Sequence, residues 1–138
     1  MAKRKFRGPE LVKEIDKAMD KGLARFVITT QSKLSAANPV DTGRMASSWF
    51  IGKGNPDRSV APERDGPGPV KVTPYDGPIT MKSDWWISNS LPYSQRVAFD
   101  PLWAKNGRRG GADWFTRIQN GLPKDAERAF DFFLRKVK

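Results

Sequence analysis

The sequence contains no cysteine and no histidine. Without cysteine, the chain has no disulfide, no thiolate nucleophile and no zinc–thiolate site. Without histidine, it lacks the usual general base near neutral pH and the commonest metal ligand. These absences exclude Ser-His-Asp and Cys-His catalysis, whereas carboxylates or a lysine of lowered pKa could still serve an enzyme such as a nuclease. We therefore expect a protein that is not an enzyme and that uses no cofactor.

Long apolar runs are also missing. Uncharged apolar runs such as Phe26-Val27-Ile28 are far shorter than the roughly 20 residues that a membrane-spanning helix needs. The basic N-terminus is not followed by the apolar region of a secretory signal. We therefore expect synthesis in the cytoplasm and no contact with a membrane.

The residues that are present indicate one folded, basic domain over 1–138. The 138 residues include 25 Lys and Arg against 15 Asp and Glu, a formal charge of +10. A chain of this length forms one domain that needs no metal or disulfide for stability. The 8 Phe, 5 Trp and 2 Tyr supply a large core or an interaction surface.

Hydrophobic periodicity predicts an α+β fold. Residues 9–36 repeat apolar side chains every three or four positions, which predicts one long helix that ends before Pro39. Strand patterns begin at Trp49 and recur at 70–73 and 79–88. Two helices are predicted over 112–119 and from 122 to 137, separated by Asn120-Gly121. We expect the long N-terminal helix to pack on a small antiparallel sheet, followed by the C-terminal helices.

The segment 52–69 is an extended Gly/Pro-rich loop, with Gly or Pro at 8 of its 18 positions. A loop of this length is usually functional or disordered. Two interpretations remain open: a solvated hairpin tip, or a loop that becomes ordered only against a neighbouring subunit.

Basic side chains are mildly concentrated in an N-terminal arm, residues 1–8, and in a Gly-rich loop at 105–111. Such charge either serves solubility or suits a polyanionic partner. Since no base-reading motif accompanies it, any contact with DNA would be to phosphates and independent of sequence. The candidate contacts to DNA or to an acidic partner are Lys3, Arg4, Lys5, Arg108 and Arg109.

Three aspartates, Asp41, Asp76 and Asp84, could in principle gather around a divalent cation. Each has a simpler role as a cap, a turn residue or a strand-surface residue, so we expect no metal site. In the pair Trp85-Trp86, a core residue beside an interface residue is favoured over a base-stacking platform.

Residues 39–49, Pro-Val-Asp-Thr-Gly-Arg-Met-Ala-Ser-Ser-Trp, form a signature after the long helix. They closely resemble the P-V-D-T-G signature of tailed-bacteriophage neck proteins, the head–tail connector and tail-completion proteins related to the minor tail protein Z type. Asn89-Ser90-Leu91-Pro92-Tyr93-Ser94 takes the place of the N-x-x-P-Y-A segment of that family. The resemblance covers most of the chain in order.

The resemblance implies a structural virion protein at the head–tail junction, made in the host bacterium. Such proteins form rings, commonly hexamers and sometimes dodecamers, that join a portal or adaptor ring to the tail terminator and tube while DNA passes through the lumen. The alternative function is that of a small basic nucleic-acid-binding protein.

The signature also has a physical interpretation. Asp41 and Thr42 can cap a turn, and Gly43 permits a backbone conformation that a β-carbon would resist. We expect Arg44 to be exposed and to pair with a carboxylate of a neighbouring subunit. The candidate contacts between subunits or rings are Arg44, Trp49, Trp86, Tyr93 and Trp103.

Overall fold

A computed structural model describes residues 7–38, 43–99 and 113–137. It confirms the α+β prediction of a long N-terminal helix, a small antiparallel sheet and a C-terminal helix. Along the chain, the elements are α1 (Gly8–Ala37), β1 (Trp49–Lys53), β2 (Trp85–Asn89), α2 (Ser94–Phe99) and α4 (Trp114–Leu134).

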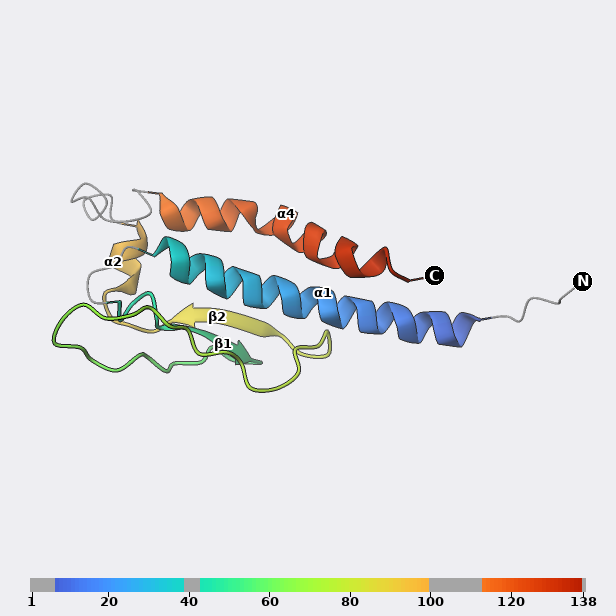
Figure 1. The fold of residues 1–138 in the computed structure, drawn as a ribbon, viewed down its shortest axis with the longest axis horizontal. Helices are drawn as coiled ribbons and strands as arrows, with labels where there is room; N and C mark the ends of the chain where they lie inside the picture. The colour runs from blue at the N-terminus through green and yellow to red at the C-terminus, as the bar shows by residue number, and fades with distance from the viewer. Residues whose placement is uncertain (1–6, 39–42, 100–112, 138) are drawn as a thin grey trace, which may run out of the picture.

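Helix α1 runs through the middle of the molecule, with α4 along one side and the two strands along the other (Figure 1). Pro9 lies in its first turn, where the missing N–H removes no helical hydrogen bond. The helix ends at Asn38, whose extended backbone (φ −58°, ψ 129°) is the conformation that a following proline favours.

The contact between α1 and α4 is close because Gly22 carries no side chain. A β-carbon at this position would lie 2.6 Å from Cδ1 and 3.0 Å from Cα of Phe130. Glycine in a helix interior costs about 1 kcal/mol relative to alanine. Here it allows the Phe130 ring to pack directly on the backbone of α1.

The sheet is smaller than the sequence predicted. Strands β1 and β2 pair antiparallel, from Trp49 opposite Asn89 to Lys53 opposite Trp85. The predicted strand at 70–73 is wrong, and of the segment 79–88 only residues 85–88 lie in a strand. The backbone at 70–73 bonds to side chains instead, since the Lys71 N–H donates to Ser47 Oγ (3.0 Å).

The break predicted at Asn120-Gly121 is also wrong, because α4 continues through these residues and through Pro123. Both Gly and Pro disfavour a helix interior. The apolar stripe that begins at Ile118 and Leu122 nevertheless continues to the buried Ala129. Packing of this stripe on α1 outweighs the local preference of the backbone.

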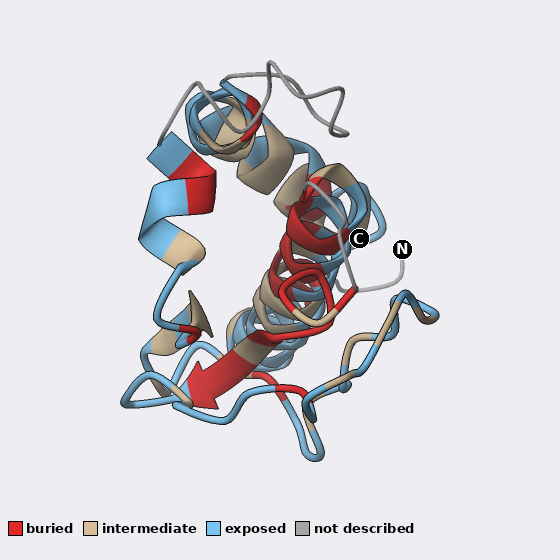
Figure 2. Cartoon of the chain, turned by 90° about the vertical axis from the view of Figure 1, so that its left-hand side faces the viewer, coloured by how far each residue is buried: buried red, intermediate tan, exposed pale blue. Residues whose placement is uncertain are grey.

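Two clusters of buried side chains form the core, and Figure 2 shows the buried segments, which are concentrated in α1 and β1. The larger cluster joins the C-terminal end of α1 to α2 and α4 around Trp49 and Trp114. Their rings meet edge to face, with centroids 6.3 Å apart. The smaller cluster joins α1 to β1 and to the loop between the strands through Val27, Ile51 and Ile79.

Gln31 ties α1 to both the sheet and the loop between the strands. Its buried amide Nε2 donates to the carbonyl oxygens of Trp49 (2.8 Å) and Thr73 (3.0 Å). We predict that Gln31→Ala lowers the free energy of unfolding by about 2 kcal/mol, because two carbonyls lose their donor. Urea denaturation measures this change.

The matched control is Gln95→Ala, the same truncation at an exposed position of α2. It is expected to change the free energy of unfolding by less than about 0.5 kcal/mol. Equal effects of the two substitutions would contradict the role assigned to Gln31.

Candidate interaction surfaces

Gly43 follows α1 and has a conformation that only glycine adopts readily. Its φ is +89°, and a β-carbon would lie 2.6 Å from Arg64 Nη1 and 2.9 Å from the carbonyl oxygen of Gly68. The turn therefore requires glycine both for its backbone and for the close approach of the loop. Asp41 and Thr42, the proposed caps, lie outside the described residues.

The sequence predicted that Arg44 is exposed and pairs with a carboxylate of a neighbouring subunit, but the structure places it differently. Its side chain is 21% exposed, and Nη1 lies 3.9 Å from Glu63 Oε1 of the same chain. Nε donates to the carbonyl oxygen of Ala61 at 2.9 Å. Arg44 therefore holds the long loop against its own domain.

Serine side chains hold the same loop at further points. Ser48 Oγ accepts the N–H of Ala61 (2.9 Å) and donates to the carbonyl oxygen of Arg44 (2.6 Å). On β2, Ser88 Oγ donates to the carbonyl oxygen of Asp57 at 3.0 Å. The segment 52–69 therefore has hydrogen-bond partners within its own chain, and its ordering against a neighbouring subunit stays a prediction.

Trp49 was predicted to contact another subunit, but it belongs to the core. It is 5% exposed, its ring stacks on Phe115, and its indole N–H donates to Asn38 Oδ1 at 3.1 Å. The alternation of side chains along a strand shows two faces but not which of them a later helix covers. Here α4 covers the face that carries Trp49.

Two of the predicted interface residues are on the surface. Trp86 is 47% exposed on β2, and Tyr93 is exposed just before α2. Large exposed aromatic side chains are typical of binding surfaces. The remaining predicted interface residue, Trp103, lies outside the described residues, as do the five predicted contacts to a polyanion: Lys3, Arg4, Lys5, Arg108 and Arg109.

An exposed apolar surface that the sequence analysis did not single out lies at the start of α1. Leu11, Val12 and Ile15 are exposed there, and the first turns of α1 extend beyond the ends of α4 and the strands (Figure 1). We call these three residues the apolar end of α1. A signal for it was the length of the predicted N-terminal helix, which exceeds that of either C-terminal helix.

A groove of about 540 Å³ opens between α1, β2 and α4. Leu23 and Val27 of α1 form its floor, and its walls are predominantly apolar. We call it the apolar groove, and its walls include Trp85, Ile87, Phe115, Ile118 and Leu122. A groove of this kind accepts a helix or an extended segment through its apolar side chains.

In the described part of the chain, the carboxylates form no group of three or more that could hold a metal ion. None of its helices combines the length and the apolar character that crossing a membrane requires.

Comparison of the chain with protein-family models, curated proteins and solved structures gives no match. The resemblance to phage neck proteins therefore rests on the sequence pattern of 39–49 and 89–94 alone.

The loop contacts lead to a prediction about Ser48. We expect Ser48→Ala to destabilise the fold by about 2 kcal/mol, because the buried N–H of Ala61 loses its acceptor. Release of the loop should also speed trypsin cleavage after the exposed Arg58. Urea denaturation and timed proteolysis of the full chain measure the two effects.

Ser90→Ala, the same truncation at an exposed position between β2 and α2, is the control. It should leave stability and cleavage unchanged. If Ser48→Ala were cleaved no faster than the wild-type protein, the hydroxyl would not be what holds the loop.

Proposed function

We propose that this protein is a structural virion protein of the phage neck. In this proposal it forms a ring, a hexamer or a dodecamer, that joins the portal or adaptor complex to the tail terminator and tube. Genomic DNA passes through the lumen of the ring. The order of the sequence pattern supports the family: a long helix, the signature at 39–49, and then Leu91-Pro92-Tyr93.

The structural observation that carries the proposal is a pair of uncovered apolar surfaces on one chain. The apolar end of α1 and the apolar groove lie at different places along the molecule. Exposed apolar patches of this kind mark protein–protein contacts. The absence of Cys and His from the sequence also favours a structural role over catalysis.

The two surfaces cannot meet within one chain. The floor of the groove is formed by Leu23 and Val27, which belong to the same continuous helix as Leu11 and Ile15. A straight helix does not fold back on itself. The apolar end of α1 can therefore enter only the groove of another copy, which is a head-to-tail contact.

Head-to-tail contacts have a geometric consequence for assembly. Each copy uses one surface to bind its neighbour and leaves the other free for the next copy, so the contact repeats and produces a closed ring or an open filament. The pattern Leu11, Val12, Ile15 provides anchors at i, i+1 and i+4 on one side of a helix, as in helices that bind apolar grooves.

The alternative function, a small nucleic-acid-binding protein that contacts phosphates, is favoured by the net charge of +10. The two functions differ in assembly. A neck protein forms rings and is present in virions, whereas a DNA-binding protein needs neither property.

The first experiment determines the mass of the protein alone by light scattering and its place in purified particles by electron microscopy. A six- or twelve-fold ring at a head–tail junction is the expected result. A monomer that is absent from particles would contradict the proposal.

A substitution experiment tests the apolar end of α1. We predict that Leu11→Ser combined with Ile15→Ser weakens ring formation roughly tenfold or more, since each side chain contributes about 1 kcal/mol when buried. The concentration dependence of mass in light scattering gives this value.

Val60→Ser combined with Val70→Ser is the matched control, because these loop residues are each 37% exposed and Leu11 and Ile15 are each 38% exposed. We expect the control to assemble as the wild-type protein does. Equal weakening by both pairs would assign the effect to general loss of apolar surface rather than to α1.

A further inference from the structure

Basic side chains line the contact between α1 and α4 on the flank away from the apolar groove. One shallow groove there is lined by Lys17 and Lys21 of α1 and by Lys136, just beyond α4. A second is lined by Arg25 of α1 and Arg128 of α4. We call these five residues the basic seam.

The ring of Phe132 joins the two shallow grooves into one surface. Arg25 Cζ lies 4.3 Å from the centroid of this ring, and Lys136 Nζ lies 4.2 Å from it. Such cation–π contacts hold flexible basic side chains in place without neutralising their charge. Phe132 therefore links the basic side chains of one groove to those of the other.

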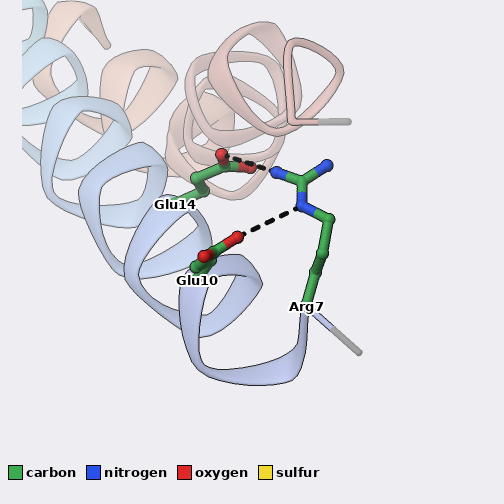
Figure 3. Close-up of polar contacts among 3 residues, drawn as sticks. All are labelled: Arg7, Glu10 and Glu14. Carbon is green, nitrogen blue, oxygen red and sulfur yellow. Dashed lines mark hydrogen bonds and ion pairs between the residues drawn. The ribbon is translucent and has the colours of Figure 1, made fainter. Parts of the chain in front are cut away.

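The two carboxylates that line the shallow grooves, Glu14 and Asp125, are bound by other cations. Figure 3 shows Arg7, whose Nε lies 3.4 Å from Glu10 Oε2 and whose Nη2 lies 3.3 Å from Glu14 Oε1. Asp125 Oδ2 lies 2.7 Å from Lys33 Nζ.

The five residues of the seam have no ion pair with a carboxylate in the part of the chain that the structure describes. Their positive charges are therefore available to a partner from outside the chain.

The spacing of the seam suits a regular array of negative charges. Lys17, Lys21 and Arg25 are four residues apart, so they recur about every 6 Å along one side of α1. Duplex DNA carries one phosphate charge per roughly 1.7 Å of its axis. The residues that line the two shallow grooves include no Asn or Gln to read base edges.

We propose that the basic seam binds the phosphate backbone of duplex DNA without regard to sequence. Under the proposed neck function, on which this part rests, the seam is the face that each subunit turns toward the DNA in the lumen. The apolar groove lies on the other side of α1, since Leu23 and Lys21 are about 160° apart around the helix. One flank is thus free for a neighbouring subunit while the other faces DNA.

The test compares two triple variants of the full chain that remove the same charge. The seam variant carries Lys17→Gln, Lys21→Gln and Arg128→Gln, all at exposed positions. The control carries Lys53→Gln, Lys71→Gln and Lys82→Gln, exposed residues of β1 and of the loop between the strands. Affinity for a fluorescent 24-base-pair duplex is measured by anisotropy as a function of salt concentration.

We expect the seam variant to reduce the slope of log K against log salt by about 3, because each phosphate contact contributes about 1. The control should retain the wild-type slope. An equal reduction in both variants, or none in the seam variant, would overturn the proposal. Equal affinity for poly-L-glutamate and the duplex would also overturn it, because the seam would then fit an acidic protein.

Light scattering of the same samples separates this inference from the proposed function. Rings that form normally in the seam variant but lose affinity for DNA support both proposals. A monomer that is also absent from particles, and whose DNA affinity depends on the seam, supports DNA binding by the seam and contradicts the ring. Rings whose affinity for DNA is the same in both variants refute the seam and leave the ring standing.

Discussion

The structure depends on one helix that packs on two sides at once. Helix α1 contacts both α4 and the strands, whereas β1 and β2 make most of their contacts with each other. On one side, Gly22 lets the ring of Phe130 rest on the helix backbone. On the other side, the amide of Gln31 binds the carbonyls of Trp49 and Thr73. Helix α1 therefore joins α4 to β1 and to the loop between the strands.

The long loop shows how a segment without a core of its own can be held. Few of its side chains are buried, but its backbone is bound by Arg44, Ser47, Ser48 and Ser88. Three of these four residues lie in the turn and bend between α1 and β1. The segment that resembles the phage signature therefore organises the surface of its own domain.

The sequence predicted the elements whose apolar pattern is long and regular. Residues 9–36 form α1, and the apolar positions of the last helix lie in α4. The sequence could not show that residues 70–73 would bond to the side chains of Ser47 and Gln31 instead of to a strand. Nor could it show which strand face α4 covers, and this decides that Trp49 is buried while Trp86 is exposed. Local patterns identify elements, but burial depends on residues far away in the chain.

The number of residues between two distant surfaces of α1 also fixes how far one surface is rotated from the other around the helix axis. Leu11 and Ile15 lie at one end of the helix, and Leu23 and Val27 form the floor of the groove further along it. One inserted residue between them would rotate the apolar end by about 100° and shift it by about 1.5 Å relative to the groove. An insertion or deletion keeps the two surfaces in nearly the same relative direction only if it has about seven or eleven residues, because these numbers are close to two and three whole turns of the helix. Substitutions on the solvent side of α1 carry no such restriction.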